Sequence, residues 1–177
     1  MCIRDRAVTL VMQSGVPVAR IEFLDEVMVK AVNQFSGLSL VEQPTLFLEF
    51  HGTKTAVKEN AEQVGEIMRD LGGSDFKWTA NQGERTTLWT ARHNAYFASI
   101  AFRPGCRALT TDVCVPISRL AECLAETKRD LGESFLTAPI VGHVGDGNFH
   151  MLVLVDPNKP EDYAEAERLN ERLVRRA

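Results

Sequence analysis

The chain lacks the sequence features that mark several classes of protein. Its 177 residues include four cysteines without Cys-x-x-Cys spacing, too few for a disulfide scaffold. No long run of Lys or Arg occurs and the formal net charge is −4, which argues against a nucleic-acid or anionic-membrane partner. No apolar stretch reaches the ~18 residues of a transmembrane helix. Sparse, reduced thiols indicate a cytosol-like compartment, so we expect a cytoplasmic location, at most peripheral to an inner membrane.

The composition is that of an ordinary globular protein. Hydrophobic residues make up 45% of the chain and charged residues 25%. These proportions exclude intrinsic disorder, collagen and coiled coils. The length is sufficient for one domain with its own core, or for part of a larger protein.

The two ends of the chain differ from the rest. Residues 1–6 have neither the apolar region nor the cleavage site of a signal peptide, and they resemble translated adaptor remnants. We treat them as a non-native leader and expect the domain to span residues 7–177. The last residues form a predicted helix, with Ala166, Leu169 and Leu173 on one face, that reaches Ala177 without a stop signal. We therefore expect a fragment, truncated at its C-terminal end.

Helices and short strands alternate along the chain. Hydrophobic periodicity predicts strands at residues 18–23, 45–50, 76–79 and 109–115 and on both sides of Asp146-Gly147. It predicts helices at residues 25–35, 55–71 and 84–100, after Pro116 and after Pro157. This mixture predicts an α+β fold with ferredoxin-like elements, in which helices pack on one face of a mainly antiparallel sheet. A doubly wound parallel sheet is the alternative.

The glycine-rich segment at residues 139–156 predicts a β-hairpin. A dinucleotide loop must open a helix, whereas these glycines lead into the apolar run at residues 151–155, which has strand character. Asp146-Gly147 between two apolar runs is a strong signal for a two-residue hairpin turn. The segment therefore argues against phosphate binding and for a hairpin.

The hairpin register predicted from this turn brings two histidines together. Asp146-Gly147 at the turn pairs Gly145 with Asn148, Val144 with Phe149, and His143 with His150. His143, Gly145, Asn148 and His150 then share one face, and Gly145 leaves room for a ligand. Opposite residues have Cβ atoms about 5 Å apart, so the two imidazoles are able to bind one metal ion. No third ligand is evident nearby, and two surface histidines without function remain the alternative.

Arg92 is the second notable residue. On the predicted helix at residues 84–100 it falls within the apolar stripe rather than on the solvent face. An arginine there must extend to solvent or meet an anion, because an unpaired buried charge is costly. Its planar guanidinium suits a carboxylate, either that of a ligand or that of a core Asp or Glu.

Three segments together resemble one protein family. They are residues 88–94 (Leu-Trp-Thr-Ala-Arg-His-Asn), residues 111–116 (Thr-Asp-Val-Cys-Val-Pro) and residues 142–150 (Gly-His-Val-Gly-Asp-Gly-Asn-Phe-His). The set resembles the C-terminal substrate domain of FAD-linked D-lactate dehydrogenases of the cytochrome type. Their wider family includes D-2-hydroxyglutarate dehydrogenases and the glycolate oxidase flavin subunit, among the vanillyl-alcohol-oxidase-like flavoproteins.

The resemblance implies roles for particular residues. His143 and His150 match the ligands of a divalent metal (zinc, manganese or iron), Asn148 matches an asparagine beside the substrate, and Arg92 matches the arginine that holds the substrate carboxylate. Thr110 stands where the hydroxyglutarate enzymes carry a lysine, which favours D-lactate. The family's third metal ligand and its catalytic histidine belong to a Gly-Glu-His-Gly segment expected beyond Ala177, so no catalytic residue is assigned in this chain.

The resemblance also implies partners. FAD would be bound mainly by an N-terminal domain that precedes this chain, a small 2-hydroxy acid would be the substrate, and a cytochrome or quinone system would accept the electrons. The fragment alone is expected to be inactive. D-2-hydroxyglutarate dehydrogenase and glycolate oxidase subunit are the alternatives within the family. Outside it stand a metal hydrolase that uses His143 and His150, and a non-catalytic metal-binding or assembly module.

Overall fold

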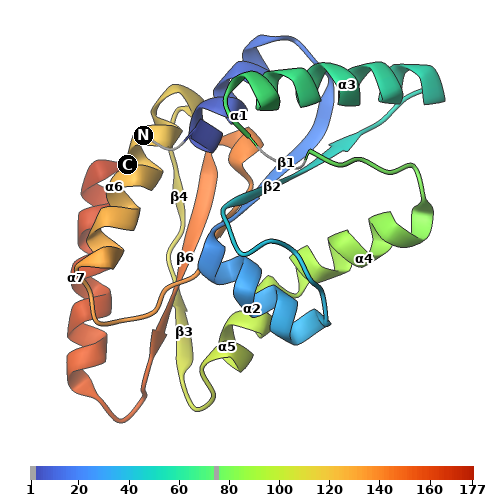
Figure 1. The fold of residues 1–177 in the computed structure, drawn as a ribbon. Helices are drawn as coiled ribbons and strands as arrows, with labels where there is room; N and C mark the ends of the chain where they lie inside the picture. The colour runs from blue at the N-terminus through green and yellow to red at the C-terminus, as the bar shows by residue number, and fades with distance from the viewer. Residues whose placement is uncertain (1–2, 74–75) are drawn as a thin grey trace.

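A single antiparallel sheet runs through the part of the chain that this computed structural model describes, residues 3–73 and 76–177 (Figure 1). Within those residues the sheet has six strands in the order β2-β1-β5-β6-β3, and β4 also pairs with β6. All of these pairs are antiparallel. The strands are β1 (Val18–Leu24), β2 (Thr45–Phe50), β3 (Arg107–Thr110), β4 (Val113–Cys114), β5 (Ile140–Gly142) and β6 (Asn148–Val155). The predicted α+β class with an antiparallel sheet is thereby confirmed.

The helices begin at residues that suit the start of a helix. Asp25 caps α2, where its carboxylate accepts a hydrogen bond from the Met28 backbone N–H at 2.8 Å, and Thr53 and Asn81 cap α3 and α4 in the same way. The α-helices are α1 (Ile3–Gln13), α2 (Glu26–Ser36), α3 (Lys54–Asp70), α4 (Gln82–His93), α5 (Ala95–Phe102), α6 (Ile117–Gly132) and α7 (Pro160–Arg176). None of the helices in the described residues is long and apolar enough to cross a membrane.

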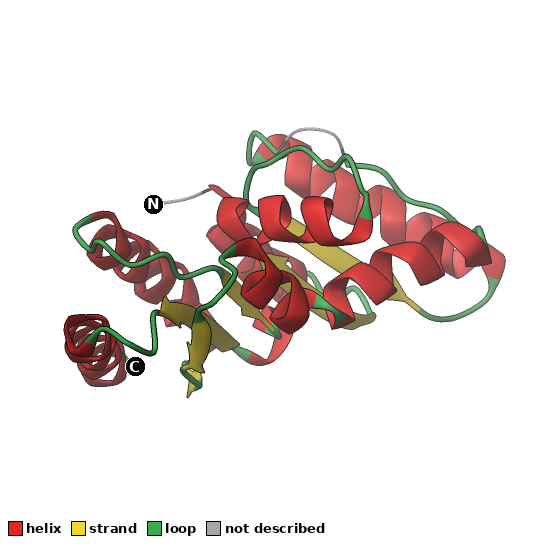
Figure 2. Ribbon diagram, turned by 90° about the horizontal axis from the view of Figure 1, so that it is seen from below, coloured by secondary structure: helices red, strands yellow, loops and turns green. Residues whose placement is uncertain are grey.

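Helices cover both faces of the sheet (Figure 2), and the expectation that they pack on one face is wrong. Buried side chains of α1, α3, α6 and α7 pack against one face, and those of α2, α4 and α5 pack against the other. The cause lies in β6, whose residues 151–155 are all buried and apolar. A strand that is apolar on both sides needs a cover on both sides, in contrast to the alternating strand of a one-sided sheet.

Three expected elements differ in detail. The helix predicted at residues 84–100 divides at Asn94 into α4 and α5. The strand predicted at residues 109–115 divides into β3 and β4, between which the Thr111 hydroxyl accepts a hydrogen bond from the Met151 backbone N–H at 2.9 Å. Residues 76–79 form no strand.

Helix α1 begins at Ile3, within the expected leader, while Met1 and Cys2 lie outside the described residues. Cys106, Cys114 and Cys123 are free thiols.

Candidate functional site

The β5–β6 hairpin exists, but its predicted register is wrong by two residues. Val141 pairs with His150 and Ile140 with Met151, so His143 lies beyond the end of β5 instead of opposite His150. A 3-10 turn at residues 144–146 replaces the two-residue turn, and the carbonyl of His143 accepts hydrogen bonds from the N–H groups of Asp146 and Asn148. Gly147 follows in the left-handed conformation, at φ 77°.

The hairpin nevertheless brings the two predicted histidines together. The ring centroids of His143 and His150 lie 6.1 Å apart, and the ring planes are nearly perpendicular. The His143 side chain is 53% exposed and that of His150 is 23% exposed, so both imidazoles are accessible from outside. The predicted proximity of the two rings is confirmed, although a turn, rather than direct strand pairing, produces it.

Both imidazoles use the same ring nitrogen for contacts within the protein. His143 Nδ1 lies 2.7 Å from a carboxylate oxygen of Glu22, and His150 Nδ1 lies 3.1 Å from the carbonyl oxygen of Thr111. A carbonyl or an ionised carboxylate is only a hydrogen-bond acceptor, so in each ring Nδ1 carries the proton. In the neutral ring, Nε2 then carries the free lone pair, which is the state in which histidine binds a metal.

Asn148 lies beside this histidine pair with its amide group oriented. Its Nδ2 donates hydrogen bonds to the Asp112 carboxylate at 2.7 Å and to the Val113 carbonyl at 3.1 Å. These contacts occupy both amide hydrogens and leave the side-chain oxygen as an acceptor. Asn148 and His150 are two apart on β6 and therefore share a face of the strand.

Arg92 forms the ion pair with a core carboxylate that the sequence allowed as one of two possibilities. Its Nε and Nη2 lie 3.0 and 2.8 Å from the same oxygen of Glu22. The Arg92 side chain is 12% exposed and that of Glu22 is 5% exposed. Because the other Glu22 oxygen contacts His143, one carboxylate joins the arginine on α4 to the hairpin histidine.

Two residues of this cluster were not predicted from the sequence. Glu22 alternates with apolar neighbours on β1, a pattern that predicts exposure, but α4 covers that face of the strand. Asp112 lies in one of the segments that carry the family resemblance, and its carboxylate is 3.4 Å from His150 Nδ1 as well as bonded to Asn148. All four predicted site residues therefore belong to one connected group with Glu22 and Asp112.

The space beside His143 is small. A cavity of about 90 Å³ lies there, lined by Met12, residues 18–22 of β1, His143, Gly145 and Asp146. A Cβ on Gly145 would lie 3.5 Å from Ile21, so this glycine faces β1 and does not open the histidine face as expected. Among the described residues, no group of three or more His, Cys, Asp or Glu side chains is arranged to hold a metal ion.

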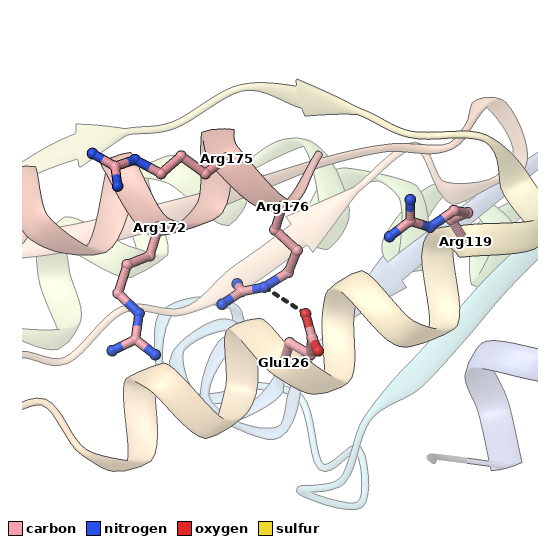
Figure 3. A pocket seen from close by; sticks show the side chains of 5 residues that line it. All are labelled: Arg119, Glu126, Arg172, Arg175 and Arg176. Carbon is pink, nitrogen blue, oxygen red and sulfur yellow. Dashed lines mark ion pairs between the residues drawn. The ribbon is translucent and has the colours of Figure 1, made fainter.

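A larger cavity, of about 440 Å³, lies away from the histidines between α6 and α7 (Figure 3). It is lined by Arg119, Glu126, Arg172, Arg175 and Arg176. Its arginines have acidic partners, for example Arg176 Nε, 2.8 Å from Glu126, and Arg172, which pairs with Asp130. We place the candidate site at the histidines because the larger cavity contains none of the predicted site residues and its charges are compensated.

A second buried carboxylate lies under α4. Glu49 on β2, 4% exposed, pairs with Arg20, Arg85 and His51. One of its oxygens lies 2.7 Å from Arg20 Nε without hydrogen-bond alignment. Burial acts to raise the pKa of Glu49, but hydrogen bonds from Arg85 and His51, together with the charges of Arg20 and Arg85, hold the pKa below its ordinary value. Glu49 thus resembles Glu22 in burial and in binding α4.

Solved structures of other proteins share this fold. The chain matches p-cresol methylhydroxylase with a TM-score of 0.60 and 15% identity, covering 99% of this chain and 40% of the other. It matches alkyldihydroxyacetonephosphate synthase with a TM-score of 0.61 and 12% identity, covering 99% and 38%. At such low identities, the TM-scores show a shared fold and nothing further. The family described as FAD linked oxidases, C-terminal domain, matches residues 5–177, and the chain belongs to that family.

Similar proteins include D-lactate dehydrogenases and a glycolate oxidase subunit. A probable mitochondrial D-lactate dehydrogenase from Danio rerio is 53% identical over 94% of this chain. A mitochondrial D-lactate dehydrogenase [cytochrome] from Arabidopsis thaliana is 42% identical over 94%, and glycolate oxidase subunit GlcD from Escherichia coli is 28% identical over 95%. The chain spans 34%, 29% and 34% of these proteins, respectively. Two of the three are named mitochondrial, and the cytoplasmic location expected from the sequence stays a prediction.

Proposed function

We propose that this chain is the substrate- and metal-binding part of a longer flavin-dependent D-2-hydroxyacid dehydrogenase that oxidises D-lactate to pyruvate. The observation that carries the proposal is the pair of imidazoles, His143 and His150, whose Nδ1 atoms are both occupied within the protein. Membership of the FAD-linked oxidases and 53% identity to a probable D-lactate dehydrogenase supply the reaction class.

The donor set fits a divalent metal ion. Two imidazoles that offer Nε2, each oriented through Nδ1 by a carboxylate or a carbonyl, match the way proteins prepare histidine ligands for zinc or manganese. Two histidines do not complete a site, so a further ligand must come from the longer protein or from the substrate. A bound metal would act as a Lewis acid that favours loss of the proton from the substrate hydroxyl.

The other site residues would bind and orient the hydroxy acid. Arg92 uses Nε and Nη2 for Glu22, which leaves Nη1 free to hold the substrate carboxylate. The Asn148 side-chain oxygen would accept a hydrogen bond from the substrate, since both of its amide hydrogens are engaged. Together they would fix the substrate beside the histidines.

Residues 139–156 do not form the kind of phosphate site that would hold FAD. The glycine-rich segment leads into β6 and not into a helix N-terminus of the kind that holds a pyrophosphate. We therefore assign FAD mainly to the remainder of the longer protein, where it would serve as oxidant. The name of the Arabidopsis relative supports a cytochrome as the final electron acceptor.

D-Lactate is the substrate favoured by the comparisons. Identity to the D-lactate dehydrogenase relatives, 53% and 42%, exceeds the 28% identity to the glycolate oxidase subunit. Thr110, at the end of β3, offers no positive charge for a second carboxylate. The first observation favours D-lactate over glycolate, and the second favours a monocarboxylate over D-2-hydroxyglutarate.

A chimera tests the proposal. The segment of the Danio rerio relative that matches this chain is replaced by this chain, the protein is loaded with FAD, and flavin absorbance is followed without oxygen. We expect D-lactate to bleach the flavin, and L-lactate, glycolate and D-2-hydroxyglutarate to do so far more slowly.

The controls are the unaltered relative and chimeras with His143→Ala or His150→Ala. Both histidine variants should retain FAD and lose bleaching. A chimera that binds FAD but is not bleached by D-lactate, while the unaltered relative is bleached, would refute the proposal. Bleaching by glycolate or D-2-hydroxyglutarate in preference to D-lactate would refute the substrate assignment.

A further inference from the structure

We propose that Glu22 is the positioning residue of this site, a single buried carboxylate that sets the tautomer of His143 and the orientation of Arg92 together. This inference rests on the proposed function in one respect, namely that His143 is a metal ligand. Its geometric part, the tautomer of His143, is testable without a metal.

The two Glu22 oxygens have separate partners. Oε1 lies 2.7 Å from His143 Nδ1, and Oε2 lies within 3.0 Å of both Nε and Nη2 of Arg92. The carboxylate is 5% exposed, so little water competes for either oxygen. Each contact is therefore a charge-assisted or ionic hydrogen bond held in a low-dielectric layer between β1 and α4.

The contact between Glu22 and His143 decides which ring nitrogen of His143 carries the proton. Free neutral imidazole in water favours the proton on Nε2, which blocks metal binding at that atom. Glu22 requires the proton on Nδ1, since an ionised carboxylate only accepts. Nε2 of His143 is then a lone-pair donor on a side chain that is 53% exposed, in a ring whose centroid lies 6.1 Å from that of His150.

Glutamine at position 22 would reverse this choice. Its amide keeps the shape of the side chain but replaces one acceptor oxygen by a donor NH₂. Two donors of Arg92 compete for the remaining oxygen, so the NH₂ group would turn toward His143. Nδ1 would then have to accept, which moves the ring proton to Nε2.

Glu49 supplies a matched control. It is 4% exposed, lies on the neighbouring strand β2, and pairs with Arg85 of α4 as Glu22 pairs with Arg92. Its histidine partner is His51, which is not among the proposed ligands. Glu49→Gln therefore removes an equally buried carboxylate under the same helix without a contact to His143.

The experiment has two measurements. Ring ¹⁵N shifts of the labelled chain at alkaline pH, where imidazole is neutral, report the tautomer of His143. Equilibrium dialysis of the chimera against Zn²⁺ reports metal affinity. We expect the Nδ1–H tautomer in the wild type and in Glu49→Gln, and the Nε2–H tautomer in Glu22→Gln. We expect Zn²⁺ affinity to fall about 10- to 100-fold in Glu22→Gln and to stay unchanged in Glu49→Gln.

Two results would overturn the inference. One is the Nε2–H tautomer of His143 in the wild-type chain, a measurement that needs no variant to fold. The other is an equal Zn²⁺ affinity in Glu22→Gln and Glu49→Gln. A wild-type chimera that binds no Zn²⁺ would instead refute the metal part of the proposed function, and the tautomer would still decide the role of Glu22.

Discussion

Replacement of Arg92 separates its ion pair with Glu22 from its proposed contact with the substrate. Arg92→Ala removes both, whereas Arg92→Lys retains a positive charge for Glu22 and loses the planar guanidinium. The single ammonium group of lysine is unable to hydrogen-bond the Glu22 carboxylate and a substrate carboxylate at the same time, as the guanidinium does. The two variants should therefore differ in stability but resemble each other in substrate binding.

The structure sets the expected magnitudes. Arg92→Ala leaves the 5% exposed Glu22 without its cation, and breaking a buried ion pair costs about 3–5 kcal/mol of unfolding free energy. His143 Nδ1 still donates to Glu22, so we expect the lower end, about 3 kcal/mol. Arg92→Lys should cost about 1 kcal/mol, in the range of an ordinary hydrogen bond. Loss of the charge-assisted bond to substrate, about 1.5–3 kcal/mol, should raise KM about 10- to 100-fold in both variants.

Two assays measure these effects. Urea unfolding of the chain, followed by tryptophan fluorescence, gives the free energies, and steady-state oxidation of D-lactate by the chimera gives KM and kcat. Trp89 lies one turn before Arg92 on α4, so its fluorescence reports this helix. If the KM of Arg92→Lys equals that of the wild type, the arginine only pairs with Glu22, and the proposed substrate contact is refuted.

Two further predictions concern stability. Burial acts to raise the Glu49 pKa, but hydrogen bonds led by that from Arg85 hold it below its ordinary value. The ionised Glu49 therefore contributes fully to the free energy of unfolding above about pH 4.5, and this contribution is lost as the pH falls through the folded-state pKa. Glu49→Gln should have a lower urea midpoint than the wild type at pH 7, and the difference between the two midpoints should decrease on acidification. A difference that stays constant from pH 7 to 3 would contradict this prediction. Gly147→Ala should destabilise the chain in thermal unfolding by over about 1 kcal/mol, since the new Cβ would lie 2.1 Å from the Val115 carbonyl oxygen. Gly37→Ala is its control, with φ 63° and no atom within 4 Å, and equal losses in the two variants would exclude the clash as the cause.

Much of the fold was predictable because it follows from local periodicity. The spacing of apolar residues in β1, β2, α2, α3, α6 and α7 agrees with their observed bounds to within a few residues. The two-sided cover of the sheet was missed, although the unbroken apolar run at residues 151–155 carried the signal. The break at Asn94 was missed because the apolar pattern continues across it from α4 into α5.

The sequence predicted that four residues of the candidate site lie together, but it did not predict the contacts that join them. His143, His150, Asn148 and Arg92 come together as expected, because the hairpin and α4 meet at β1. The histidine register failed because Asp146-Gly147 was assigned to a two-residue turn, while the chain forms a 3-10 turn there. Glu22 escaped notice because single-strand alternation contains no information about which helix will cover the polar face.

Two ion pairs connect helix α4 to the sheet. Ala91 is its fully buried residue, whereas Arg85 and Arg92, two helical turns apart, each bind a carboxylate of β1 or β2. A helix with so little apolar burial is expected to detach locally at a lower free energy than global unfolding. Such detachment would withdraw Arg92 from Glu22 and leave His143 as the only partner of that carboxylate among those described. Local opening of α4 would therefore withdraw the arginine proposed to hold the substrate carboxylate, while the contact between Glu22 and His143 is retained.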